Sequence, residues 1–279
     1  MTLEDLPPLR DSLSAAGITA AKRFGQHFLL DLNICRKIVK IAEVSPGQVV
    51  LEVGPGPGGL TRALIEAGAR VTAVEKDARF LPLLADLEAA SGGGLTVVHG
   101  DALDVDEEKL VGSGATIVAN LPYNVGSPLL VKWLVGALRP ASLTLMFQAE
   151  VARRIAANPG EEDYGRLAVL SQAIAEPRIA MGLPARAFTP PPKVDSAVVR
   201  LVPRADRPSH EVIAALQRAT AHAFGQRRKM MRSSVKALGG AHLCERAGID
   251  PDARAETVSV AAFLTLAALL VEGDVASTR

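Results

Sequence analysis

A glycine-rich turn between a predicted strand and a predicted helix most constrains the fold of this chain. The residues "QVVLEVG" (48–54) form an apolar run, and "GPGPGGLT" (54–61) follows with four glycines. Glycines at such a junction let the backbone turn sharply and approach a ligand closely. "GLTRALIEAG" (59–68) then has helical spacing and ends in glycine, which favours a helix stop. This strand, turn and helix predict an α/β fold with a ligand beside the turn.

The alternation of strand and helix extends along the chain. Further strand-like runs lie at 70–77, 95–103, 116–124 and 141–148, and helix-like segments at 34–43, 78–90 and 128–138. Strands that alternate with helices indicate parallel β-α-β units, so we predict a doubly wound sheet.

The pattern changes near Pro203. "FTPPPKVDSAVVRLVPR" (188–204) is Pro-rich and then alternates like a strand, and helix-like segments follow at 210–224, 227–238 and 259–272. We therefore predict a loose N-terminal tail at 1–21 with room for a short helix, an α/β domain at 22–203 and a small helical domain at 204–279.

Composition narrows the class of protein. Hydrophobic residues make up 48% of the 279, which is ample for a core. No apolar run approaches the roughly 18 residues that span a bilayer, and no basic-then-apolar leader is present. Cys35 and Cys244 have no metal-like spacing. We expect a cytoplasmic enzyme without disulfides, metal or membrane contact, and nothing requires more than a monomer.

The net charge of +1 hides an asymmetry. From Arg186 to the end, 14 Lys and Arg face 9 Asp and Glu, a balance of +5, whereas the remainder has 17 against 21, a balance of −4. A basic C-terminal third on a mildly acidic body suggests a polyanionic partner, although chance explains such a distribution about as well.

Two acidic residues follow later strands. Glu75 ends the strand after the turn and is placed to accept hydrogen bonds from both ribose hydroxyls of a nucleotide-like cofactor. Asp101 is placed to accept from an adenine amine. Either a dinucleotide such as NAD or S-adenosylmethionine fits this pattern. Pro55 and Pro57 remove two N–H donors that a pyrophosphate would use, which argues modestly for S-adenosylmethionine.

The motif "NLPYN" (120–124) ends the fourth predicted strand, where an open α/β sheet binds its substrate. The Asn120 side-chain carbonyl and the Leu121 backbone carbonyl suit the two N–H groups of an adenine amine, whose lone pair would then point at a methyl donor. Pro122 stiffens the turn, and Tyr123 offers a ring for a flipped-out base. No general base is built in, so rate would come mainly from positioning.

These motifs, in this order, resemble the ribosomal RNA adenine N6,N6-dimethyltransferase family. The resemblance runs from about residue 23 to about residue 238. It rests on the following stretches: "FGQHFL" (24–29), "LEVGPGPGGLT", "VEKD", "GDAL", "NLPYN", "YGRLAVL" (164–170), "FTPPPKVDSAVV" (188–199) and "FGQRRKMMRSSVK" (224–236).

The resemblance implies a Rossmann-like class I methyltransferase sheet with a small C-terminal helical domain. It implies dimethylation of two adjacent adenosines near the 3′ end of small-subunit (16S) rRNA, in an assembling small subunit. The implied cofactor residues are His27, Leu29, Gly54, Gly56, Glu75, Lys76, Asp101, Ala102 and Asn120. Phe188 would stack on the target base opposite Tyr123. The implied RNA-binding residues are Lys193, Arg227, Arg228, Lys229 and Arg232.

Two departures from the family pattern stand out. Position 27 is more often Asn, and His keeps a donor there but adds a pH dependence. "RSS" (232–234) stands where Arg and two Asn are usual, which bears on the RNA contact or packing of that segment.

Three other functions fit part of the sequence. A related enzyme that methylates a large-subunit adenosine shares the turn and the Asn-x-Pro-Tyr motif. A non-catalytic assembly checkpoint would use the same fold to bind immature ribosomes. An NAD dehydrogenase fits least, because of the prolines and because "NLPY" has no use in hydride transfer.

Overall fold

The chain forms two compact units in this computed structural model, which describes residues 2–21, 25–226 and 228–277. The first unit comprises the residues up to Ala152 together with Arg178–Val202, and the second comprises Arg153–Pro177 together with the residues from Pro203 on. The second unit therefore resumes at the predicted boundary. Residues 153–177, which we placed in the α/β domain, belong instead to the helical unit.

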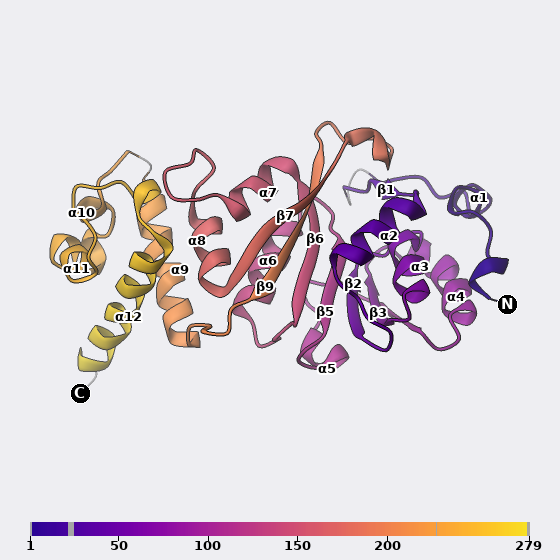
Figure 1. Cartoon of the computed structure of the whole chain (residues 1–279), viewed down its shortest axis with the longest axis horizontal. Helices are drawn as coiled ribbons and strands as arrows, with labels where there is room; N and C mark the ends of the chain where they lie inside the picture. The colour runs from indigo at the N-terminus through magenta and orange to yellow at the C-terminus, as the bar shows by residue number, and fades with distance from the viewer. Residues whose placement is uncertain (1, 22–24, 227, 278–279) are drawn as a thin grey trace. The chain divides into compact units, whose positions relative to one another are not determined.

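A seven-stranded sheet runs through the first unit (Figure 1). Its order is β4 (Leu95–His99), β3 (Arg70–Glu75), β2 (Val49–Val53), β5 (Thr116–Asn120), β6 (Ser142–Gln148), β9 (Ser196–Pro203) and β7 (Ala175–Leu183). The first five strands are parallel to one another. The predicted α/β class is confirmed.

The sheet is mixed, which the sequence did not reveal. Strand β9 pairs antiparallel with β6, with Leu143 opposite Leu201. Alternating hydrophobicity determines which face of a sheet a residue occupies, but it carries no information on strand direction.

Helices flank these strands along the chain. They are α1 (Leu9–Ala15), α2 (Leu32–Ile41), α3 (Gly59–Glu66), α4 (Leu81–Ala90), α5 (Glu107–Val111) and α6 (Gly126–Val135), with 3-10 turns at η1 (Leu3–Asp5), η3 (Ala78–Phe80) and η4 (Ala185–Ala187). Helix α2 packs on α3, α3 on β3 and α4 on β4. In α2, the Asp31 side chain caps the first turn, and Cys35, Ile38 and Val39 face the core at helical spacing.

The N-terminal segment contains the short helix that we allowed for, but it is packed and not the loose tail that we expected at 1–21. Leu9 and Leu13 of α1 are buried. Arg62 on α3 donates from Nη1 to the Pro7 carbonyl at 2.9 Å. Seven residues of helix gave too short a hydrophobic period to be distinguished from a tail.

A second, two-stranded sheet joins segments that are far apart in the chain. Strand β1 (Phe28–Leu29) pairs antiparallel with β8 (Phe188–Thr189), with Leu29 opposite Phe188. This pairing brings the "FGQHFL" and "FTPPPKVD" motifs together.

The second unit is helical. Its elements are α8 (Arg166–Ile174), α9 (His210–Phe224), α10 (Met231–Ser234), η5 (Lys236–Leu238), α11 (Gly240–Arg246), η6 (Ala255–Thr257) and α12 (Val260–Ser277), and α7 (Ala149–Ala156) leads into it. Helix α9 packs on both α8 and α12. The Tyr164 hydroxyl donates to the Val258 carbonyl at 2.9 Å, and the Tyr164, Phe224 and Phe263 rings pack together.

The segment 227–238 is not the continuous helix that we predicted. Arg228 and Lys229 lie in a turn, Met230 forms a bridge with Arg254, and only the four residues of α10 are α-helical before η5. Among the described residues, none of the helices combines the length and the apolar character needed to cross a membrane.

Candidate active site

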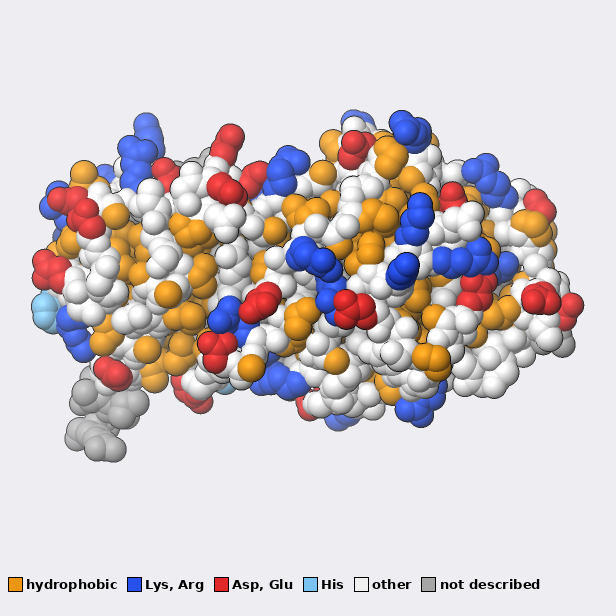
Figure 2. All heavy atoms as spheres, viewed as in Figure 1, with side chains coloured by type: hydrophobic (Ala, Val, Ile, Leu, Met, Phe, Trp, Pro, Cys, Tyr) orange, Lys and Arg blue, Asp and Glu red, His pale blue; other side chains and the backbone are white. Residues whose placement is uncertain are grey.

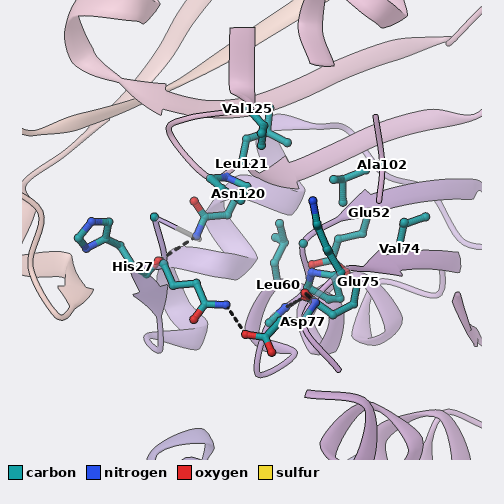
Figure 3. A pocket seen from close by; sticks show the side chains of 18 of the residues that line it. His27, Glu52, Leu60, Val74, Glu75, Asp77, Ala102, Asn120, Leu121 and Val125 are labelled. Carbon is teal, nitrogen blue, oxygen red and sulfur yellow. Dashed lines mark hydrogen bonds between the residues drawn. The ribbon is translucent and has the colours of Figure 1, made fainter. Parts of the chain in front are cut away.

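A cavity of about 240 Å³ opens at the carboxyl ends of β2, β3 and β5 in the first unit (Figure 3). The glycine-rich turn, strand β1 and the loop after β4 complete its lining. All nine residues predicted to bind a cofactor line it: His27, Leu29, Gly54, Gly56, Glu75, Lys76, Asp101, Ala102 and Asn120. The four residues of "NLPY" line it as well.

Two separate constraints favour glycine in this turn, one on the backbone conformation and one on the space for a side chain. Gly54, Gly56 and Gly58 have φ of +70°, +53° and +86°, a region that side chains disfavour. Gly59 meets a steric limit instead, because a Cβ there would lie 2.6 Å from the Leu29 carbonyl. The turn therefore both bends the chain and lets β1 pass close beside it.

The Glu75 carboxylate is held by backbone donors. Its Oε2 accepts from the Gly56 N–H at 3.0 Å and its Oε1 from the Asp77 N–H at 2.7 Å. Burial raises the pKa of Glu75, and these two N–H groups oppose that rise. A carboxylate has about four acceptor positions, so two remain for ligand hydroxyls.

Asp77 was not singled out from the sequence. It is 4% exposed, and it accepts from Arg79 Nη2 at 2.6 Å and from Gln26 Nε2 at 2.8 Å. The Arg79 guanidinium lowers the pKa of Asp77 to about 2. Arg79 also donates to the Thr19 carbonyl at 3.1 Å. This cluster ties the N-terminal segment to the Glu75 side of the cavity. Asp77 and Arg79 are neighbours in the sequence, but Gln26 and Thr19 lie far from them in the chain, so no local sequence pattern connects the whole cluster.

Asp101 and Lys76 form an ion pair at the rim. The bond from Lys76, and then the Leu103 N–H, lower the pKa of Asp101. The sequence predicted both residues in the site but not that they pair.

Glu52 was also missed. It is 1% exposed at the end of β2, it lines the cavity, and its Oε2 has no hydrogen-bond partner among the described residues. Burial raises the pKa of Glu52 to about 8. A carboxyl within the otherwise apolar run "VVLEV" was the available signal.

Asn120 ends β5 on the opposite side of the cavity from Glu75 (Figure 3). Its Nδ2 donates to the His27 carbonyl at 3.5 Å. The side-chain atom of Asn120 that can accept from a ligand is then Oδ1. Leu121 and Pro122 follow directly and line the same space.

The Tyr123 ring is half-buried beside this motif. Its hydroxyl and Ser196 Oγ are 2.7 Å apart, and burial raises the pKa of Tyr123 while the bond to Ser196 opposes the rise. The ring stacks on His27 with centroids 5.4 Å apart. His27 Nδ1 lies 2.8 Å from the Pro190 carbonyl, and because a carbonyl only accepts, Nδ1 carries the proton.

Phe188 differs from the other residues predicted to act in catalysis. Its side chain is 3% exposed in the hydrophobic core and is not among the residues that line the cavity. The pairing of β8 with β1 turns it inward. Stacking of Phe188 on a base stays a prediction, and it would require this ring to become accessible.

The residues predicted to bind RNA come from both units. Lys193 lies exposed in the loop after β8, in the first unit. Arg228, Lys229 and Arg232 are exposed in the second unit, where Arg232 pairs with Asp252 at 2.9 Å. Arg227 lies outside the described residues. Ser234, in the "RSS" stretch that departs from the expected pattern, is buried.

The first unit has the fold of class I methyltransferases, as comparison with solved structures shows. A dimethyladenosine transferase from Plasmodium falciparum superposes with a TM-score of 0.73 at 25% identity, over 86% of this chain and 96% of that chain. The 23S rRNA methyltransferase ErmE superposes with a TM-score of 0.68 at 27% identity, over 87% and 99%.

Residues 17–272 match the family model of ribosomal RNA adenine dimethylases, and the chain belongs to this family. It is 66% identical to ribosomal RNA small subunit methyltransferase A of Phenylobacterium zucineum, over 96% of this chain and 94% of that protein. It is 64% identical to the protein of the same name from Caulobacter vibrioides, over 91% and 98%.

Proposed function

We propose that this chain transfers methyl groups from S-adenosylmethionine to N6 of two adjacent adenosines near the 3′ end of small-subunit rRNA. The reaction would take place in the cytoplasm, on an assembling small subunit. The names of the two relatives from Phenylobacterium zucineum and Caulobacter vibrioides support the small subunit as substrate. The observation that carries the chemistry is the placement of the Asn120 amide across the cavity from Glu75.

The cavity suits S-adenosylmethionine. The remaining acceptor positions of Glu75 match two ribose hydroxyls, and Asp101 matches the adenine amine. Gly54, with His27 and Leu29, lines the part assigned to the methionine end. Bound there, the cofactor would supply an electrophilic methyl group on a positively charged sulfur.

The residues of "NLPY" act on the target amine. An adenine amine attacks poorly because its lone pair is delocalised into the ring. When Asn120 Oδ1 and the Leu121 carbonyl accept its two N–H groups, the nitrogen is drawn toward a tetrahedral shape and its lone pair is oriented. No general base is needed, since the methylated nitrogen is acidic enough to release its proton to water. The contribution of the protein is then mainly positional.

Tyr123 holds the base in place. Its ring is anchored at the hydroxyl by Ser196 and on one face by His27. Stacking of a flipped-out base on such a ring contributes roughly 1–3 kcal/mol. The second methylation uses the same amine, so this pocket must also admit a monomethylated nitrogen.

The basic surface for RNA includes more than the predicted residues. Lys193 would contact phosphate near the cavity, and Arg228, Lys229 and Arg232 would do so in the second unit. Lys and Arg side chains also gather over α2 and α3 (Figure 2), where Arg36, Lys37 and Lys40 are exposed. This basic face lies in the part of the chain before Arg186, which has a net charge of −4, so the net charge of that part did not reveal it.

The test is transfer of labelled methyl from S-adenosylmethionine to unmethylated small and large ribosomal subunits, followed by nucleoside analysis. Dimethyladenosine in small-subunit RNA alone is the expected result. Label in large-subunit RNA would instead indicate a substrate like that of ErmE, a 23S rRNA methyltransferase. Absence of label from both, with retained binding to small subunits, would overturn the proposed chemistry in favour of an assembly factor that only binds.

A further inference from the structure

Lys132 lies at the centre of a part-buried cluster outside the residues assigned so far. Its Nζ donates to the Ala102 carbonyl at 2.7 Å, to the Val105 carbonyl at 2.6 Å and to Glu107 Oε1 at 2.9 Å. These bonds use all three N–H groups of the ammonium. Trp133 Nε1 donates to the same Glu107 oxygen at 2.9 Å. Glu107 and Trp133 are 4% and 1% exposed, so the acceptor side of the cluster is shielded from water.

The cluster joins two parts of the cavity lining. Ala102, whose carbonyl accepts the bond from Lys132, lines the cavity next to Asp101. Lys132 and Trp133 belong to α6, whose first turn is bonded to the "NLPY" motif, because the N–H groups of Val125 and Gly126 both donate to the Pro122 carbonyl at 3.1 Å. The loop after β4 and the motif after β5 are therefore connected through one part-buried ammonium.

Lys132 also acts through its charge. The pKa of Asp101 is lowered chiefly by its bond from Lys76, next by the Leu103 N–H, and further by the positive charge of Lys132. Lys76 is 59% exposed and pairs with Asp101 from the solvent side, whereas the Lys132 side chain is 28% exposed. Screening by salt weakens exposed interactions more than buried ones.

We propose that Lys132 is a positioning residue that sets the affinity for the methyl donor. By holding Ala102 and Val105, it keeps the Asp101–Ala102 side of the cavity at the distance from Asn120 that an adenosyl group requires. Lys132 itself touches neither cofactor nor target base. This inference rests on the proposed function, since it assumes S-adenosylmethionine as the ligand.

The test is the Lys132→Met variant, which keeps the long apolar side chain and removes the ammonium. Binding of S-adenosylmethionine is measured by calorimetry and binding of small subunits by filter retention, with kcat and both KM values alongside. We expect the Kd and KM for S-adenosylmethionine to rise about tenfold, the equivalent of one lost hydrogen bond to a charged group. The Kd for subunits and kcat should stay near the parent values.

Lys109→Met is the matched control. Lys109 is 84% exposed on α5 and pairs only across one helical turn with Asp106, so its removal should leave both affinities unchanged. A purely structural role for Lys132 would lower thermal stability without the selective rise in the cofactor Kd, and that outcome would overturn the inference.

Trp133→Phe decides the matter if Lys132→Met does not fold. This substitution removes the bond from Trp133 to Glu107, which is one of the four hydrogen bonds of the cluster, and it keeps an aromatic ring in the core. We therefore expect the Kd for S-adenosylmethionine to rise about threefold. If this variant folded and bound S-adenosylmethionine with the Kd of the parent protein, the inference would be overturned and the proposed function would stand. A parent protein that bound no S-adenosylmethionine would overturn the proposed function and this inference together.

Discussion

The two sides of the cavity differ in how firmly their polar groups are held. On the Glu75 side, Glu75 and Asp77 are each about 5% exposed and accept hydrogen bonds from well-placed donors. On the Asn120 side, the Asn120 amide has one long bond of 3.5 Å, and Tyr123 and His27 are half-buried. A side that is already ordered suits a small ligand that is the same in every cycle. The more open side suits a base that arrives on a large RNA.

Replacing the acceptor on the open side should have the largest effect. Asn120→Ala removes the Oδ1 that orients the target amine, and we expect methyl transfer to fall by about 100-fold or more, since misplacement alone has such effects. Binding of small subunits should change little. Label transfer under single-turnover conditions measures the effect.

Asn33→Ala is the control, because Asn33 is an exposed amide on α2. Transfer by Asn120→Ala at the parent rate would show that the geometry of the open side does not drive the reaction.

Asp77→Asn tests the ordered side. A group whose folded pKa is depressed stabilises the fold above its unfolded pKa and loses that contribution as pH falls. Asp77 has a folded pKa of about 2 against an ordinary 3.8. We expect the variant to lose about 2 kcal/mol of unfolding free energy at pH 7. The difference should narrow as pH falls from about 4 toward 2. Urea unfolding at several pH values measures it.

The exposed pair of Asp106 with Lys109 provides the comparison for this variant. Asp106→Asn should leave the unfolding free energy almost unchanged, because exposed ion pairs contribute little to stability. If Asp77→Asn behaved in the same way at pH 7, the Glu75 side would be no more firmly held than the surface.

Tyr123→Phe separates anchoring from stacking on the open side. The variant keeps the ring and loses the bond to Ser196, so we expect about 1 kcal/mol less unfolding free energy. Methyl transfer should stay within a few-fold of the parent. Loss of activity as severe as in Asn120→Ala would mean that the hydroxyl contributes more than a hydrogen bond to Ser196.

Lys193→Ala should give the smallest effect. If Lys193 contacts one phosphate, the slope of log K for subunit binding against log salt should fall by about 1, with little change at the salt concentration of the assay. Titrations at several salt concentrations measure it against Lys109→Ala. Equal slopes in all three proteins would remove Lys193 from the RNA surface.

The sequence predicted the cavity better than its surroundings. Residues that follow parallel strands must meet at one edge of a sheet, so Gly54, Glu75, Asp101 and Asn120 could be placed together from strand order alone. Asp77 with Gln26, and Lys132 with Ala102, depend on side chains that meet only after folding. No local pattern encodes such pairs.

The predictions about the fold that were wrong failed for the same reason: they depend on contacts between distant segments. Strand β7 begins "AEP" and is largely exposed, so it has no apolar run to reveal it. Residues 227–238 favour a helix locally, but the Met230 bridge to Arg254 interrupts it. Phe188 was placed by its motif, whereas its burial follows from the partner strand at Leu29.

The interleaving of the two units has a consequence for the order in which the chain is made. After residue 202 has been synthesised, every segment of the first unit exists. Helix α8 has also been made by then, yet α9 and α12, which bury it, come from residues 210–277. Tyr164 must likewise await Val258, 94 residues further on. During translation, residues 153–177 therefore form an apolar insertion without its core, and a chain ended at 203 would keep that surface permanently uncovered.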